Sequence, residues 1–217
     1  MRFDAVIFDL DGTLLDTLED IADAANSVLA AHGYPTHSLA DFRYFVGDGA
    51  RELTRRVLPE KARDDATVDK ILAEFKQQYG ANWNNKTSVY AGVPEMLDGL
   101  VARGLALAVL SNKPDDFTKN CVAELLPDWS FEIVIGLREG LPPKPDPMGA
   151  FDVARRLGFR SQRIVFVGDT SVDMKTAVAA GMFPVGALWG FRTADELQLS
   201  GAQAIIEKPE DVLSLLL

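Results

Sequence analysis

The sequence predicts an α/β fold in which a doubly wound parallel sheet carries a helical insertion after its first strand. Short apolar runs rich in β-branched residues recur along the 217-residue chain, as expected for buried parallel strands. Turn residues and helically spaced apolar residues follow these runs, which indicates right-handed strand–helix–strand units. The stretch from residue 17 to 87 interrupts this pattern and is far too long for a simple connection.

The expected strands of the sheet lie at residues 5–8, 105–110, 133–135, 164–167 and 185–188. Between them, the spacing of apolar residues predicts helices over 117–126, 148–157 and 174–180. We therefore expect one α/β core domain, formed by residues 1–16 and 88–217. Within it, the segment 211–217 is expected to form a short helix that packs on the core, or to expose an apolar end that serves an oligomer contact.

Residues 17–87 are expected to form a separate helical domain. The start of this segment, Asp16-Thr17-Leu18-Glu19-Asp20, offers an N-cap with acidic residues in the first turn of the expected helix. The apolar residues of this helix share one face: Ile21, Ala24, Ala25, Val28 and Leu29. His32-Gly33-Tyr34-Pro35 ends the helix, and no strand-like alternation appears in the rest of the segment.

Composition and charge favour an ordinary globular protein with a small-molecule partner. Hydrophobic residues make up 47% of the chain and charged residues 25%, which is typical of soluble domains. The formal net charge is −10 without a run of Lys and Arg, so we expect no nucleic-acid partner. Because no apolar run could span a bilayer and aspartates interrupt the N-terminal apolar stretch, we expect no membrane association and no signal peptide. The single cysteine, Cys121, fits a cytoplasmic location.

Two aspartates at the end of the first expected strand are the first candidate site residues. Asp9 and Asp11 are two positions apart, so in an extended chain their side chains project to the same side. Gly12 permits a tight turn directly after them. In an open α/β sheet this is the crevice where ligands bind, although aspartates are also common in turns without a function.

Further polar residues follow the second strand and precede a later helix. Ser111 and Asn112 end the second strand, where a hydroxyl and an amide can bind anionic oxygen or simply cap the next helix. Lys144 lies within Pro142-Pro143-Lys144-Pro145-Asp146-Pro147, whose prolines fix the backbone around one cation. We expect Lys144 to neutralise carboxylates and phosphate oxygens rather than to point into solvent.

The fourth strand is followed by Gly168-Asp169-Thr170-Ser171-Val172-Asp173, which places two carboxylates one helical turn apart. With Asp9 and Asp11 they make four carboxylates at two strand ends, and these repel one another unless a cation lies among them. An oxygen-rich donor set that also takes water and phosphate oxygen suits Mg²⁺, whereas Zn²⁺ prefers His and Cys ligands. We therefore predict Mg²⁺ as the cofactor.

Taken in order, these motifs resemble those of the haloacid dehalogenase superfamily and span most of the chain. Asp9 to Thr13 is similar to the first motif, Ser111-Asn112 to the second, Lys144 to the third, and Gly168-Asp169 with Asp173 to the fourth. The resemblance implies a Rossmann-like core. It also implies that residues 17–87 form a type-one cap domain inserted after the first strand.

The resemblance further implies a hydrolase that transfers a phosphoryl group. Asp9 would attack phosphorus and form an aspartyl-phosphate, while Asp11 would act as general acid and then as general base. Mg²⁺ would be held by Asp9, the Asp11 backbone carbonyl and Asp169. Asp173 would support these ligands without binding the metal directly. The cap would exclude water until the intermediate has formed.

The other motif residues would bind the phosphate group. By the same resemblance, Ser111, Asn112 and Lys144 would position and stabilise its oxygens, so Lys144 counts as both catalytic and phosphate-binding. Dehalogenases of the superfamily lack the second aspartate, so Asp11 argues against their chemistry. A phosphatase fits the residues better.

Within the superfamily, the chain resembles phosphoglycolate phosphatases. This resemblance is carried by Ser111-Asn112-Lys113-Pro114, by Trp189-Gly190-Phe191 and by the cap run 42–53. It implies a small phosphorylated substrate, 2-phosphoglycolate. The candidate substrate contacts in the cap are Gly47, Asp48, Gly49 and Arg51, although these glycines also suit a plain turn between helices.

Several alternatives share the same motifs. A β-phosphoglucomutase-like mutase is the main one, and pyrophosphatases, sugar phosphatases and nucleotidases of the superfamily are others. A non-enzymatic binding protein is disfavoured because every motif residue is present. The sequence leaves open a monomer or a homodimer, an open or closed cap, and the roles of Arg43, Arg51, Arg55 and Arg192.

Overall fold

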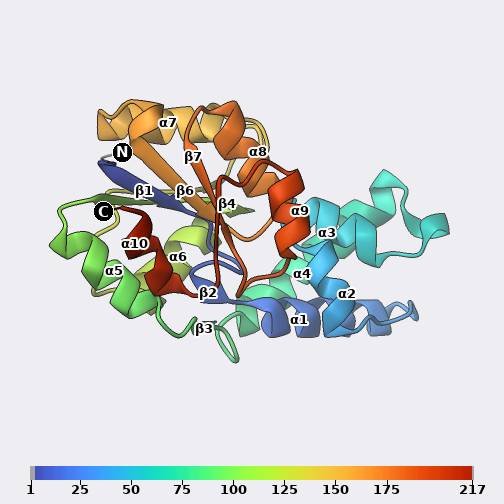
Figure 1. Ribbon diagram of the computed structural model, residues 1–217. Coiled ribbons are helices and arrows are strands. Elements are labelled where there is room, and N and C mark those ends of the chain that lie inside the picture. The colour runs from blue at the N-terminus through green and yellow to red at the C-terminus, as the bar shows by residue number, and fades with distance from the viewer. Residues whose placement is uncertain (1–2, 217) are drawn as a thin grey trace. The chain divides into compact units, whose positions relative to one another are not determined.

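The computed structural model describes residues 3–216, which divide into two compact units (Figure 1). One unit contains the described residues up to Leu15 and those from Val89 onward, and the other is Asp16–Ser88. The chain passes between the units in two short strands, β2 (Leu15–Asp16) and β3 (Ser88–Val89). Over residues 3–216, no helix combines the length and the apolar character that crossing a membrane requires.

A six-stranded parallel sheet forms the centre of the first unit, in the order β5-β4-β1-β6-β7-β8. Its strands are β1 (Ala5–Phe8), β4 (Ala106–Pro114), β5 (Ile133–Leu137), β6 (Ile164–Gly168), β7 (Phe183–Ala187) and β8 (Ala204–Ile206). The predicted fold class is confirmed, and all five expected strands are present. β8 was not predicted from the sequence.

Helices cover both faces of this sheet, as Figure 1 shows. On one face lie α7 (Met148–Leu157) and α8 (Ser171–Ala179), and on the other lie α5 (Val93–Ala102), α6 (Asp115–Leu125) and α10 (Val212–Leu215). α9 (Ala194–Leu199) connects β7 to β8. The C-terminal helix is shorter than the expected 211–217, and Leu217 lies outside the described residues.

The strand order places β1 at a topological switch point. From β1 the sheet extends through β4 and β5 on one side and through β6, β7 and β8 on the other. β1 pairs in register with both neighbours, with Phe8 opposite Val109 of β4 and Val167 of β6. Because all three strands are parallel, their carboxyl ends meet at one edge, which is where open α/β sheets bind ligands.

The second unit is helical, and no strand lies within residues 17–87. Its helices are α1 (Leu18–Ala31), α2 (Leu39–Phe45), α3 (Ala50–Val57) and α4 (Asp65–Asn82). Ser38 and Asp41 form a capping box at α2, and Asp64 caps α4 by accepting from the Thr67 N–H. The five apolar residues predicted for the inner face of α1 are all buried.

One detail of α1 differs from the sequence expectation. Thr17 is the N-cap residue by position, but its side chain makes no capping hydrogen bond. Instead, the buried Asp20 carboxylate accepts hydrogen bonds from the backbone N–H groups of Lys86 (2.9 Å) and Thr87 (2.8 Å). These bonds join the first helix of the unit to its last residues.

Candidate functional site

Asp9 and Asp11 lie directly beyond the carboxyl end of β1. Asp9 is buried, and its backbone N–H donates to the Val167 carbonyl at 3.0 Å, which continues the pairing of β1 with β6. Asp11 is partly buried at the start of the following turn. Gly12 has a φ of +86°, and a Cβ atom there would lie 2.4 Å from Asp169 Oδ2, so the turn requires glycine on both counts.

Lys144 lies between two carboxylates of the site. Its Nζ is 2.9 Å from Asp9 Oδ1 and 2.6 Å from Asp173 Oδ1, and all three side chains are buried. Apart from this ion pair, Asp9 Oδ1 is a buried oxygen without a hydrogen-bond partner in the described part of the chain. The predicted function of Lys144 as a neutralising cation thus has a geometric basis, while its contact with phosphate stays a prediction.

Asp169 is held by donors from two distant segments. Thr13 Oγ1 donates to Asp169 Oδ1 at 2.8 Å, and the Phe191 N–H donates to Oδ2 at 2.9 Å. Gly190 packs against the same side chain, since a Cβ atom at Gly190 would lie 2.3 Å from Asp169 Cβ. This packing fixes the orientation of the Asp169 carboxylate.

Asp173 uses its two oxygens for different purposes. Oδ1 faces Lys144, whereas Oδ2 accepts from the backbone N–H of Thr170 at 3.1 Å and from Thr170 Oγ1 at 2.6 Å. These bonds form the capping box that begins α8. Asp173 therefore connects the start of α8 to the lysine.

Three of the site's carboxylates are arranged as a metal centre requires. Oxygens of Asp9, Asp169 and Asp173 all lie within 4.8 Å of one another, and all three residues are buried. Among the described residues, Lys144 is the cation that pairs with them, so three carboxylates face one positive charge. The donors are all oxygens and one of them has no hydrogen-bond partner, so this set fits a hard divalent cation.

The electrostatics of the site without a metal agree with this interpretation. Burial raises the pKa of Asp9 to about 6, and repulsion by Asp173 adds to the rise while Lys144 opposes it. Burial, then repulsion by Asp173 and Asp9, raises the pKa of Asp169 well above its ordinary value. Burial lowers the pKa of Lys144, but Asp173 and Asp9 together more than reverse this effect. A bound cation would relieve the repulsion among the carboxylates.

The end of β4 contributes three consecutive polar residues, all of them buried. Ser111 Oγ lies 3.4 Å from the Lys113 N–H. The Asn112 side chain bonds the backbone of Lys144 at both ends of its amide: Nδ2 donates to the Lys144 carbonyl at 3.0 Å, and Oδ1 accepts from the Lys144 N–H at 2.8 Å. The phosphate-binding roles of Ser111 and Asn112 remain predictions.

Lys113 is a residue to which the sequence analysis gave no role. Its Nζ lies 2.9 Å from Asp11 Oδ1 and 3.3 Å from Asp11 Oδ2. The side chain of Lys113 is 4% exposed and that of Asp11 13%, so this is a largely buried ion pair. The signal available in the sequence was the position of Lys113 at the same strand end as Ser111 and Asn112.

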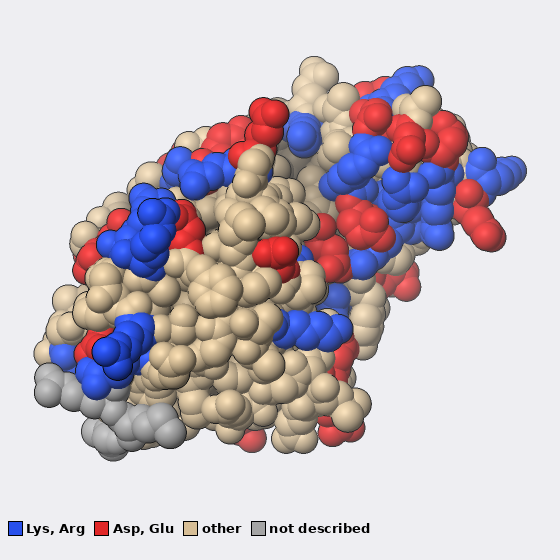
Figure 2. All heavy atoms as spheres, turned by 90° about the horizontal axis from the view of Figure 1, so that it is seen from above, with Lys and Arg blue, Asp and Glu red and all other residues tan. Residues whose placement is uncertain are grey.

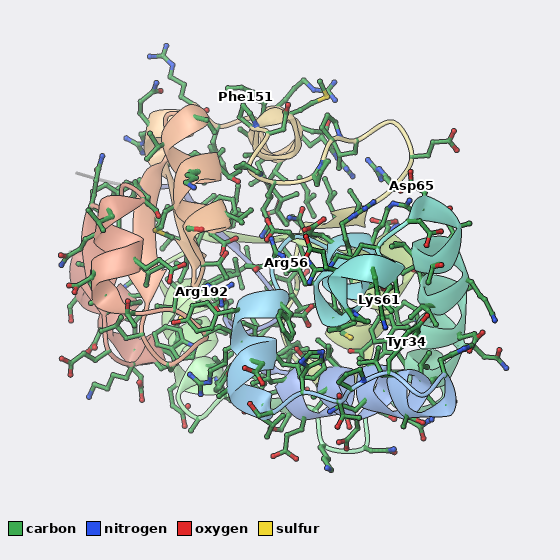
Figure 3. All side chains as sticks on the ribbon, turned by 90° about the vertical axis from the view of Figure 1, so that its right-hand side faces the viewer. Tyr34, Arg56, Lys61, Asp65, Phe151 and Arg192 are labelled. Atoms are coloured by element: carbon green, nitrogen blue, oxygen red, sulfur yellow. The ribbon has the colours of Figure 1, made fainter. Side chains whose placement is uncertain are left out.

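The candidate residues of the helical unit contact other residues of that unit. Gly47 and Gly49 have φ angles of 125° and 88°, and Asp48 pairs with Arg56 at 2.6 Å. Arg51 pairs with Asp69 and, at 3.0 Å, with Asp65. Figure 3 labels Arg56 and Asp65, and Figure 2 shows basic side chains beside acidic ones on the visible face.

Two of the arginines left open by the sequence also have acidic neighbours. Arg55 pairs with Asp65 at 2.9 Å and donates to the Arg63 carbonyl at 3.0 Å. Arg192 is buried in the sheet-containing unit, where its Nε lies 3.1 Å from Glu196 Oε1 (Figure 3). These pairs give each arginine a structural role, and they assign no ligand to it.

Comparison with known proteins extends these observations. A family model described as haloacid dehalogenase-like hydrolase matches residues 6–187. A phosphoglycolate phosphatase of Xanthomonas campestris is 34% identical over 96% of this chain and 95% of its own length. A phosphoglycolate phosphatase of Pseudomonas syringae is 37% identical over 86% of this chain and 70% of its own length. A crystal structure of a candidate phosphoglycolate phosphatase from Lactobacillus delbrueckii has a TM-score of 0.93 at 30% identity, and covers 100% of this chain and 99% of its own.

Proposed function

Because the chain belongs to the haloacid dehalogenase-like hydrolases, we propose that it is a magnesium-dependent phosphatase that acts on 2-phosphoglycolate. The observation that carries the proposal is the buried group of Asp9, Asp169 and Asp173 around Lys144. Three buried carboxylates around a single lysine suit a cation and a phosphate group together. The names of the relatives support 2-phosphoglycolate as the substrate.

The proposed reaction has two steps that both involve Asp9. First, a carboxylate oxygen of Asp9 attacks phosphorus, the bond from phosphorus to the leaving oxygen breaks, and Asp11 gives that oxygen a proton. Second, water attacks phosphorus of the aspartyl-phosphate, Asp11 takes a proton from the water, and the bond to Asp9 breaks. The products are an alcohol and inorganic phosphate, and both aspartates return to their initial states.

The remaining residues of the site stabilise charge on the transferring group. Asp9, Asp169 and the Asp11 backbone carbonyl are the proposed ligands of Mg²⁺, which when bound neutralises charge on the phosphoryl oxygens. Asp173 supports them through Lys144. Lys144, Ser111 and Asn112 are the proposed contacts of the phosphate oxygens, a form of positioning on which phosphoryl transfer depends.

We further propose that the helical unit is the cap domain and that residues 47–51 contact the substrate. Gly49 precedes α3 at a φ of 88°, and Arg51 is a cation in the first turn of that helix. Replacement of Arg51 by Met is expected to change the order of preference among substrates while the core chemistry persists. Arg63→Met, which removes another arginine of the same unit, is the control.

The experiment that tests the function is a measurement of phosphate release with Mg²⁺. The panel contains 2-phosphoglycolate, pyrophosphate, sugar phosphates and nucleotides, and it is repeated with Asp9→Asn and with EDTA. We expect the wild type to prefer 2-phosphoglycolate. We expect this activity to be lost with Asp9→Asn and with EDTA. Asp128→Asn, which replaces an exposed aspartate of the same unit, should leave activity unchanged.

The same experiment separates the alternatives. Asp9-dependent release from another member of the panel would keep the mechanism and replace the substrate. If no release depends on Asp9, a mutase is tested next by supplying β-glucose 1-phosphate with a bisphosphate and measuring isomerisation. Absence of both activities would favour a binding role.

A further inference from the structure

We propose that Lys113 is a positioning residue that holds the Asp11 carboxylate ready to take a proton from the water that hydrolyses the aspartyl-phosphate. The proposal rests on the proposed phosphatase function and deepens it by adding a residue to the second step. It starts from the contact of Lys113 Nζ with both oxygens of Asp11, at 2.9 and 3.3 Å. A cation placed between two carboxylate oxygens restrains rotation of the carboxylate.

The fold holds the backbone of Lys113 firmly. Lys113 lies near the end of β4, within the stretch from Leu110 to Pro114 over which the register of the pairing with β5 shifts. Thr118 Oγ1 donates to the Lys113 carbonyl at 3.1 Å. Gly136 of β5 approaches the same carbonyl so closely that a Cβ atom there would lie 2.6 Å from it. These contacts fix the position of the Lys113 backbone, from which its side chain extends toward Asp11.

The two buried lysines of the site form ion pairs with different carboxylates. Lys144 contacts Asp9 and Asp173, whereas the ion pair of Lys113 is with Asp11. Lys144 is thus placed to balance the metal-binding carboxylates, and Lys113 to balance the residue that moves protons. Because the contact of Lys113 is with both oxygens of a proton acceptor, we place its effect in the hydrolysis of the intermediate.

The test uses p-nitrophenyl phosphate, whose leaving group departs with little need for a proton. For this substrate kcat/KM reports the steps up to release of p-nitrophenol, whereas kcat also includes hydrolysis of the aspartyl-phosphate. Lys113→Met removes the cation and keeps an unbranched side chain. Lys113→Gln keeps a hydrogen-bond donor, and Lys119→Met is the control because Lys119 is exposed and pairs with Asp115 on the surface.

If the proposal is correct, Lys113→Met lowers kcat by about 10- to 100-fold, as expected when a proton-transfer group is misplaced. KM falls with kcat, so that kcat/KM changes much less, and phosphorylated Asp9 accumulates and is detected by mass spectrometry. Lys113→Gln shows the same pattern to a smaller extent. KM is independent of the fraction of folded enzyme, so partial misfolding cannot produce this result.

A loss of kcat/KM as large as the loss of kcat, without phosphorylated Asp9, would overturn the proposal in either variant. Lys113 would then act in substrate binding or in the first step. Failure of the proposed function gives a different result, because wild-type activity would not depend on Asp9. The two failures are therefore distinguishable.

Discussion

The side-chain amide of Asn112 forms two hydrogen bonds with the backbone of Lys144, at 3.0 and 2.8 Å. This contact connects the end of β4 to the proline-rich segment that carries the lysine. Since both groups are buried, the bonds replace water that would otherwise solvate the Lys144 peptide groups. Asn112 thereby helps to place the lysine between Asp9 and Asp173.

Asn112→Asp is expected to lower kcat/KM for the preferred substrate by about 100-fold, the effect of displacing a catalytic group by about 1 Å. A carboxylate cannot donate to the Lys144 carbonyl, so one of the two bonds is replaced by repulsion. Steady-state kinetics measure the effect, and Asn120→Asp, on the exposed side of α6, is the control. Equal activity of the two variants would show that the bonds from Asn112 are not needed to place the lysine.

Removal of Lys144 is expected to destabilise the metal-free protein. Lys144→Met leaves buried carboxylates without their cation, which typically costs about 3–5 kcal/mol. Urea unfolding in EDTA measures the loss, and Mg²⁺ is expected to restore part of it by neutralising the same carboxylates. Lys119→Met breaks an exposed pair instead, so its effect should stay below about 1 kcal/mol. If Mg²⁺ does not restore any of the stability that Lys144→Met loses, this result would argue against a metal at these carboxylates.

The stability of the metal-free protein is expected to depend on pH through Asp9. Burial raises the pKa of Asp9 from 3.8 to about 6, so between these values the folded protein binds a proton that the unfolded protein does not. The contribution of Asp9 to the free energy of unfolding is therefore fully present below about pH 4 and decreases as the pH rises through 6. Asp9→Asn removes this dependence.

The measurement compares urea unfolding of wild type and Asp9→Asn in EDTA from about pH 4 to pH 7. The variant should gain stability relative to wild type as the pH rises, by up to about 3 kcal/mol, which corresponds to the difference between the two pKa values. Asp128→Asn is the control, since Asp128 is exposed. A constant difference between variant and wild type over this range would contradict the prediction.

The sequence predicted the fold, and it predicted that several candidate residues lie at one edge of the sheet, because both depend on local patterns. Strands buried on both faces read as apolar runs, and the residues after β1, β4 and β6 lie at one edge once the strands are parallel. The positions of Asp9 and Asp169 could be inferred from this rule, whereas Lys144 was predicted from the prolines around it. The two-residue strands β2 and β3 are too short to leave any pattern.

The partners within the site could not be inferred in the same way. Lys113 is 102 positions from Asp11, and Asn112 is 32 positions from Lys144. Which lysine pairs with which carboxylate depends on the register of β4 and on the bend in the proline-rich segment. Similarly, the Thr17 side chain makes no capping hydrogen bond, and that outcome depends on packing around the start of α1.

Gly12 is expected to be required for catalysis through its contact with Asp169. Gly12→Ala introduces a side chain at a φ of +86° and places its Cβ 2.4 Å from Asp169 Oδ2. The carboxylate must then move, and displacement of this proposed metal ligand is expected to lower kcat/KM by about 100-fold or more. Binding of Mg²⁺, measured by calorimetry, should weaken in parallel.

Gly104→Ala separates the two effects of the substitution at Gly12. Gly104 has a similar φ of +73°, but a Cβ atom there would meet no atom within 4 Å. This variant is therefore expected to lose about 1–2 kcal/mol of stability from backbone strain alone and to keep its activity. If Gly12→Ala keeps its activity as well, close packing of the turn does not orient Asp169, and the bonds from Thr13 and Phe191 are sufficient.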